Sequence, residues 1–257
     1  MFTRIAEDLP DEVGFATKKP RAESPDMALY EAYISELDDI YARTESVFKE
    51  TVMPFDENCE ETPGFYNKSR QIVRDSSFHE LVGTSTTPFA YGRVHEYIGR
   101  ICCMDNRPGR EKIEGDWIPD NTTIVKARIG VPALGGFLVQ HNITRKYNEG
   151  SRVIIVWRKF TEGEGAFAGM HSDEIGWNIV RPSPSCGGGS TLLESVTRFV
   201  PMNFSTATAS GATVMKQFAD TIIKTGEQDC QECIQMLEKM LLDDAIGVCS
   251  RTSNSYR

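Results

Sequence analysis

The stretch "GFLVQHNITRKYNEGSRVIIVWRKF", residues 136–160, contains two strand patterns joined by a turn. Its first half alternates between apolar and polar side chains, which predicts a half-buried antiparallel strand. The apolar face carries Phe137, Val139, His141, Ile143 and Tyr147, and the other face carries Gln140, Asn142, Thr144 and Lys146. The turn-forming triplet at 148–150 leads into the apolar run at 153–157, so the stretch predicts a β-hairpin.

Strand patterns continue on both sides of this hairpin. The segment "TTIVKARIGV" (122–131) precedes it across a turn that contains proline and glycine. The segments "GWNIVRP" (176–182) and "TLLESVTRFVPMNF" (191–204) follow it, separated by the glycine-rich loop "SPSCGGGS". Tight turns between consecutive strands predict an antiparallel meander of five strands, and an early strand pair near residues 70–82 is a candidate addition.

Helical patterns lie before and after the meander. Apolar residues recur at spacings of three, four or seven after the N-cap candidate Ser24, which predicts a helix over 26–53. A shorter helix is expected over 87–104. From residue 209 the apolar period changes to three and four residues, which predicts a long amphipathic helix over 209–246.

These patterns predict one domain with a tail. Residues 1–25 are charged, contain prolines and show no sustained periodicity, so a disordered N-terminal tail is predicted there. Residues 26–250 are predicted to form the domain. The expected fold class is α+β, with a curved antiparallel sheet around a long C-terminal helix.

The run "GEGAFA", residues 163–168, follows a predicted strand and matches the dinucleotide-binding pattern G-x-G-x-x-G/A. Its context does not fit, because another strand follows it and the connection is a meander rather than a βαβ unit. Glu162 and Glu164 would also place carboxylates where a pyrophosphate needs backbone N–H groups. The run is therefore interpreted as a hairpin loop, with Phe167 and Met170 folding back onto the sheet, and no cofactor is predicted.

Composition and motifs narrow the function classes. The net charge of −9, from 28 Lys and Arg against 37 Asp and Glu, works against binding to a phosphate backbone, so no nucleic acid is expected as a partner. No run approaches the roughly 18 apolar residues of a membrane span, and the first residues lack the apolar core of a signal peptide, so a cytoplasmic location is expected. Cys230 and Cys233 have the spacing of half a zinc site, but both fall on the apolar stripe of the terminal helix without a second pair. No metal site and no catalytic motif are predicted.

Four segments together resemble a known family. They are "NITRKYNEGSRVIIVWRKFTEGEG" (142–165), "DEIGWNIVRP" (173–182), "RFVPMNF" (198–204) and "DTIIKTGEQDCQECIQMLEKMLLD" (220–243). They resemble the StAR-related lipid-transfer (START) domains, and most of all the START-like group of oomycete proteins of the mating-specific type. The resemblance covers about residues 27–246. It implies a helix-grip fold, in which a bent sheet holds the C-terminal helix around an apolar tunnel for one lipid or sterol, without metal or covalent chemistry.

The resemblance and the strand faces together suggest a ligand site. The candidate lining residues are Trp157, Trp177, Ile155, Ile179, Arg181, Arg158, His141, Phe218 and Ile222. Arg181 would meet the polar group of the ligand, because a charge among apolar groups needs a partner. The alternatives are a packed core for the tryptophans, Arg181 paired with Glu174 or Glu194, a surface-facing Arg158, and a hydrogen-bonded core His141.

The first functional hypothesis is a monomeric, non-enzymatic carrier or sensor that binds one lipid or sterol and contacts membranes transiently. Two other classes stay open. A helix-grip enzyme of the cyclase or hydrolase type would use His141 or an acid in the cavity as its base. A protein-interaction module would have a small or filled cavity. The volume of the cavity and the titratable groups inside it distinguish the three classes.

Overall fold

The computed structural model describes residues 26–51, 69–74, 78–101, 109–184, 189–203 and 209–253. Its centre is an antiparallel sheet of eight strands in the order β1-β2-β8-β7-β6-β5-β4-β3. The strands are β1 (Ser69–Arg74), β2 (His79–Thr87), β3 (Arg110–Ile113), β4 (Thr122–Val131), β5 (Gly136–Asn148), β6 (Val153–Gly165), β7 (Met170–Pro182) and β8 (Thr191–Asn203). The helices are α1 (Met27–Ala42), α2 (Thr44–Glu50), α3 (Tyr91–Ile101) and α4 (Ala209–Ser253), with a 3-10 turn η1 (Pro132–Leu134).

The sheet contains the meander that the sequence predicts. Strands β4 to β8 are each paired with the next in antiparallel register. The early strand pair joins this meander, because β2 pairs with β8 and β1 with β2. The short strand β3, which pairs with β4, was not predicted, because four residues are too few to show a period.

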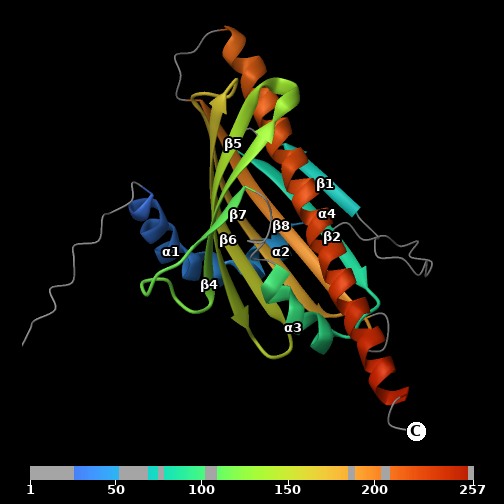
Figure 1. The fold of residues 1–257 in the computed structure, drawn as a ribbon. Helices are drawn as coiled ribbons and strands as arrows, with labels where there is room; N and C mark the ends of the chain where they lie inside the picture. Colours follow the sequence, from blue (N-terminus) through green and yellow to red (C-terminus); the bar gives the residue numbers. More distant parts are fainter. Residues whose placement is uncertain are drawn as a thin grey trace, which may run out of the picture.

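Helices cover both faces of the sheet (Figure 1). The first two helices, α1 and α2, pack on one face, which we call the α1 side. The other face, which we call the α4 side, holds α3 and the long C-terminal helix (Figure 1). The α+β helix-grip prediction is confirmed by this arrangement.

The core on the α1 side joins the first helix to the central strands. Leu37 and Ile40 of α1 pack with Ile154, Val156 and Trp177 of the sheet. Trp177 Nε1 donates a hydrogen bond to the Ile40 carbonyl oxygen at 2.8 Å. The C-terminal end of α1 is thereby fixed to β7.

The N-terminal helical segment differs from the single helix expected over 26–53. It consists of α1 and α2, with Arg43 as the residue between them. The Thr44 hydroxyl donates to the Tyr41 carbonyl oxygen at 2.7 Å, a local hydrogen bond of the kind that competes with the regular helical ladder. Apolar spacing did not reveal this break, because both helices turn their apolar residues to the same core.

The core on the α4 side has two parts. Near the start of α4, Phe218 packs with Phe167 of the hairpin and Phe199 of β8. Further along, Leu237 and Leu241 pack with α3 and with β6 and β7. The helix continues past the predicted end at 246.

The hairpin interpretation of the "GEGAFA" run is confirmed. A Cβ at Gly163 would lie 2.2 Å from the Phe167 carbonyl oxygen, so the chain passes too closely there for any other residue. Phe167 and Met170 are both buried in the core under α4.

Candidate functional site

A cavity of about 260 Å³ lies between the sheet and the helices α3 and α4. Its sheet wall includes Gln140, Asn142, Thr144, Trp157, Lys159 and Glu174. Its helical wall includes Ile98, Ile101, Ile222, Ile223, Gly226 and Leu237. One wall of the cavity is therefore largely polar and the opposite wall largely apolar.

Polar side chains cross the sheet wall in rows that the strand register sets. Asn142 of β5 is paired with Lys159 of β6, and Lys159 is paired with Glu174 of β7. In the neighbouring row, Thr144 of β5 is paired with Trp157 of β6. Alternate residues of a strand point to the same face, so both rows lie on the α4 side.

Glu174 is the hydrogen-bonding centre of this wall. Its Oε1 accepts hydrogen bonds from Trp157 Nε1 and from Lys159 Nζ, each at 2.7 Å. Glu174 is 5% exposed, so its charge is removed from bulk water and needs the Lys159 ammonium as its counter-charge. Trp157, Lys159 and Glu174 thus form one hydrogen-bonded polar group on the cavity wall.

Asn142 carries an acceptor atom that no described residue hydrogen-bonds to. Its Nδ2 donates to Thr144 Oγ1 at 3.2 Å. Its Oδ1 is shielded from solvent and has no hydrogen-bond partner among the described residues. A buried acceptor without a partner costs about 1–3 kcal/mol, so a ligand that donates to this oxygen removes that cost.

The helical wall is apolar except where an ion pair joins α4 to an edge strand. Arg110 of β3 and Asp229 of α4 are 2.5 Å apart, with side chains 11% and 20% exposed. Gly226 lies on the same face of α4, and a Cβ placed there would have no atom within 4 Å. The middle of α4 therefore borders open space in the cavity.

Three of the predicted lining residues, Ile155, Trp157 and Ile222, border this cavity. Phe218 lies one turn before Ile222 on α4, and its ring meets the Phe167 ring edge-on with centroids 5.6 Å apart. Phe218 is fully buried in the core next to the cavity and does not border it.

Trp177 and Ile179 do not border the cavity, and their placement corrects the prediction. On β7 the cavity-facing residues are Glu174, Asn178 and Val180. Trp177 and Ile179 alternate with these and point to the α1 side, where they join the core under α1. The sequence pattern grouped residues correctly within each strand but assigned this β7 group to the wrong face.

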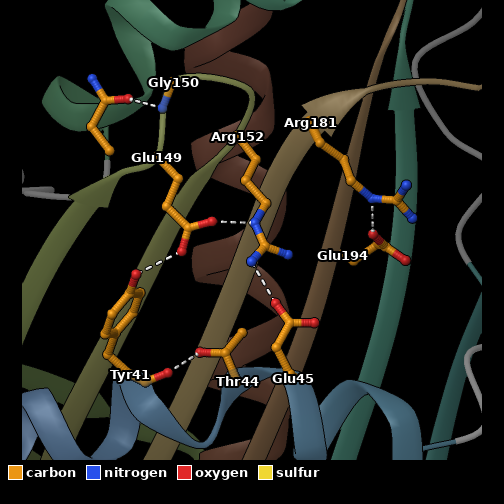
Figure 2. Close-up of polar contacts among 9 residues, drawn as sticks. Tyr41, Thr44, Glu45, Glu149, Gly150, Arg152, Arg181 and Glu194 are labelled. Carbon is orange, nitrogen blue, oxygen red and sulfur yellow. Dashed lines mark hydrogen bonds and ion pairs between the residues drawn. The ribbon is translucent and has the colours of Figure 1, made fainter.

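Arg181 also points away from the cavity, so this prediction is corrected as well. Its Nε lies 2.7 Å from Glu194 Oε2, as the ion-pair alternative expected. Figure 2 shows this pair beside the contacts that join α2 to the sheet, where Arg152 bonds to Glu149 and Glu45. A second hollow of about 360 Å³ lies here between α2 and the sheet, and both of its arginines are already in ion pairs.

Arg158 is a contact between the sheet and α1 rather than a cavity residue. Its guanidinium is 2.9 Å from Glu36 and 3.1 Å from Asp173, and it lies 4.3 Å from the centre of the Tyr33 ring. The side chain is 14% exposed, so it is neither in the cavity nor freely solvated. A cationic group stacked on an aromatic ring between two acids is a structural anchor.

His141 lies on the α1 side, which corrects its placement in the ligand site. Its Nδ1 hydrogen-bonds with the Tyr30 hydroxyl at 3.0 Å, and its side chain is almost fully buried. Burial lowers the pKa of His141, because an imidazolium ion is costly away from water, while the charge of Asp26 acts in the opposite direction. The structure therefore matches the alternative of a hydrogen-bonded core histidine.

The polar side of β5 supplies candidate residues that sequence reasoning missed. Gln140, Asn142 and Thr144 were assigned to the polar face of a half-buried strand, yet they border the cavity. A usable signal was present in the next strand. Trp157 shares its sheet face with Thr144, and a large aromatic residue beside a polar row indicates that this face is covered.

No protein-family model and no curated protein matches the chain. Human STARD10 aligns with 76% of this chain and 86% of its own, at 8% identity and a TM-score of 0.42. The Zhui aromatase/cyclase from Streptomyces sp. R1128 aligns over 63% and 94%, at 13% identity and a TM-score of 0.43. The lipid transfer and protein localization domain of human StarD13 aligns over 67% and 84%, at 10% identity and a TM-score of 0.39. The chain is thus distantly similar in structure to START and other helix-grip proteins, which include a lipid-transfer domain and an aromatase/cyclase.

The described part of the chain has no helix that is both long enough and apolar enough to cross a membrane. Within the same residues, no group of three or more His, Cys, Asp and Glu side chains is placed to hold a metal ion. The fold and the site define a helix-grip protein with an internal cavity that is polar on its sheet wall and apolar on its helical wall.

Proposed function

We propose that this protein binds a single amphipathic molecule of the lipid or sterol class in the cavity between the sheet and α4. The observation that carries the proposal is a space of about 260 Å³ that combines an apolar helical wall with hydrogen-bonding groups on the sheet wall. Asn142 Oδ1, a buried acceptor without a partner among the described residues, is the atom that most directly favours a ligand. Binding is driven by transfer of the apolar body out of water, worth about 2.5 kcal/mol for each 100 Å² buried.

The size of the cavity favours a small ligand. Small-molecule sites span roughly 300–1,000 Å³, and the volume of about 260 Å³ here lies just below that range. A sterol or a single-chain lipid suits this space better than a phospholipid with two acyl chains. We include in the proposal that such a ligand is exchanged with a membrane during transient contact.

The alternatives have less support from the site. The base considered for an enzyme, His141, lies on the α1 side and is already hydrogen-bonded to Tyr30. Lys159 and Glu174, the titratable pair on the sheet wall, neutralise each other. The open space beside Gly226 does not fit a module whose cavity is filled.

The test uses Gly226, because a side chain there fills the cavity without meeting another atom at Cβ. A fluorescent sterol analogue is titrated into the unchanged protein and into the Gly226→Leu variant. We expect one equivalent to bind to the unchanged protein and the affinity to fall about tenfold or more in the variant, because leucine occupies the space of the ligand. The substitution favours the helix by roughly 1 kcal/mol, so lost binding is not a sign of unfolding.

Two control variants accompany this test. Gly226→Ala brings most of the gain in helix propensity with little added volume, and it is expected to keep most of the affinity. Gly92→Leu makes the same exchange at an exposed glycine of α3 with open space around it, outside the cavity lining, and it is expected to bind as the unchanged protein does. Equal affinity of Gly226→Leu and Gly92→Leu would show that the ligand binds elsewhere.

A further inference from the structure

We infer that the cavity selects an uncharged ligand whose hydroxyl or carbonyl groups lie along one face of an apolar body. This inference rests on the proposed function and names the class of ligand for the same site. It follows from how the charged side chains of the cavity are paired and from where its polar atoms lie.

Among the described residues, each charged side chain that borders the cavity already has a counter-charge. Lys159 and Glu174 are 2.7 Å apart, and Arg110 and Asp229 are 2.5 Å apart. Glu194, the remaining charged residue of the lining, is paired with Arg181 at 2.7 Å. A carboxylate, sulfate or ammonium on the ligand would find no free charged partner in this described lining.

A charged ligand would therefore have to break one of these pairs. The side chains of Lys159, Glu174, Arg110 and Asp229 are between 6% and 20% exposed, so a displaced partner would be left poorly solvated. Leaving a buried charge without its partner is strongly unfavourable. Hydroxyl and carbonyl groups, in contrast, can hydrogen-bond to the paired side chains without separating them.

The polar atoms are spread along the sheet wall rather than gathered at one end. Asn142, Lys159 and Glu174 form one cross-strand row, and Thr144 and Trp157 belong to the next. A third row places Asn178 beside Ser195. These rows are two residues apart along the strands, so the polar wall extends over about 13 Å at the usual rise of a strand.

The opposite wall offers hydrocarbon over the same length. Ile222 and Ile223 of α4 lie toward one end of the cavity, and Leu237 of α4 with Ile98 and Ile101 of α3 lie toward the other. A molecule with a single polar head and a long apolar tail would place hydrocarbon against most of the polar wall, whose groups would then lose contact with water without gaining a polar partner. A rigid ring system with polar groups on one face and hydrocarbon on the other satisfies both walls at once.

Asn142 favours a ligand that carries a hydrogen-bond donor at this position of the cavity. Its Oδ1 has no partner among the described residues, while its Nδ2 is bonded to Thr144. A ligand hydroxyl that donates to this oxygen completes the hydrogen bonding of the row. This contact favours a hydroxyl over a carbonyl at the point where the ligand passes Asn142.

The experiment compares three steroid probes by isothermal titration with the full chain. They are cholesterol, cholesterol sulfate, and an uncharged steroid triol with all its hydroxyls on one face. We expect the triol to bind about tenfold or more tightly than cholesterol sulfate, with cholesterol between them, because only the sulfate must separate a buried ion pair. Tightest binding of the sulfate would overturn the charge rule, and weaker binding of the triol than of cholesterol would overturn the polar-face rule.

A charge variant tests the same rule by a change of selectivity. In Glu174→Gln the Lys159 ammonium loses its counter-charge while Trp157 Nε1 keeps an oxygen acceptor. The ratio of sulfate to cholesterol affinity is expected to rise at least tenfold, because the sulfate can now pair with Lys159. An unchanged ratio would contradict the inference. The matched control is Glu36→Gln, which removes the carboxylate of an ion pair on the α1 side and should leave the ratio unchanged.

A second variant keeps the test decisive if Glu174→Gln does not fold. Lys159→Met leaves the Glu174 carboxylate unpaired, and this variant is expected to gain affinity for a steroid amine and not for the sulfate. Lack of that gain would equally contradict the inference. Failure of all three steroid probes and of a single-chain fatty alcohol to bind the unchanged protein would overturn the proposed function itself. Binding of the fatty alcohol without any steroid, or steroid binding with the wrong order of affinities, overturns only the ligand class.

Discussion

The position of the Trp157 ring in the cavity wall depends on a single residue of the next strand, Gly176. A Cβ at Gly176 would lie 1.9 Å from Trp157 Cζ2, so the indole ring occupies the space that a side chain on β7 would take. In this position Trp157 Nε1 reaches Glu174. The absence of a side chain at 176 thus permits the hydrogen bond that holds the polar group together.

At this scale we predict that Gly176→Ala displaces the Trp157 ring. The free energy of unfolding is expected to fall by about 2–4 kcal/mol, from overpacking and loss of the hydrogen bond to Glu174. Urea unfolding measures the stability, and tryptophan fluorescence reports the displaced ring. The control is Gly83→Ala, where the added Cβ would meet only the end of the Ser195 side chain at 3.0 Å. Equal losses in the two variants would contradict the close packing of Trp157 on Gly176.

Individual residues also show where sequence reasoning succeeded and where it stopped. Alternation placed Ile155 with Trp157, and Trp177 with Ile179, and both groupings are correct. It did not reveal that the two groups lie on opposite faces of the sheet. A period of two gives the relative direction of side chains within a strand, and the choice of face depends on the register between strands and on which helix covers each face.

At the scale of elements, α4 forms one wall of the cavity, and we expect this helix to move when a ligand enters or leaves. Among the ion pairs of α4 are Arg110 with Asp229 beside the cavity and Arg93 with Asp244 nearer the C-terminal end of the helix, each at 2.5 Å. The first pair is the more buried, with side chains 11% and 20% exposed against 37% and 35% for the second. The first pair is therefore expected to contribute more to holding α4 closed.

We predict that Asp229→Asn speeds release of a bound neutral sterol analogue by about three- to tenfold, because loss of a partly buried ion pair lowers the barrier to opening. Stopped-flow fluorescence after mixing with excess liposomes measures the release rate. Asp243→Asn, an exposed change on the same helix, is the control and should leave the rate unchanged. If Asp229→Asn and Asp243→Asn release the ligand at equal rates, α4 does not open at this point.

The long elements were the most predictable part of the fold. The meander from β4 to β8 and the terminal helix α4 have enough residues to show their periods clearly. The short strand β3 and the interruption at Arg43 between α1 and α2 do not. Local hydrogen bonds and pairing with an adjacent strand determine such short features. The spacing of apolar residues depends on neither, so it does not predict them.

At the scale of the whole molecule, the helices on both faces of the sheet explain why the sequence predicted only part of the cavity lining. Because helices cover both faces of the sheet, both faces must bury side chains, and the usual contrast between an apolar inner face and a polar outer face is lost. Gln140, Asn142 and Thr144 therefore had the pattern of a solvated face while forming a cavity wall. His141, on the apolar face of the same strand, belongs to the solid core under α1.

The central claim is that one amphipathic molecule occupies the cavity under α4, and native mass spectrometry of the purified full chain tests it most directly. The account predicts a single added mass of one small molecule, from the expression host or after incubation with mixed liposomes that include sterols. It also predicts that this added mass is lost in Gly226→Leu and kept in Gly92→Leu. A protein that stays bare after incubation with the liposomes, or an added mass that Gly226→Leu retains in full, would contradict the account.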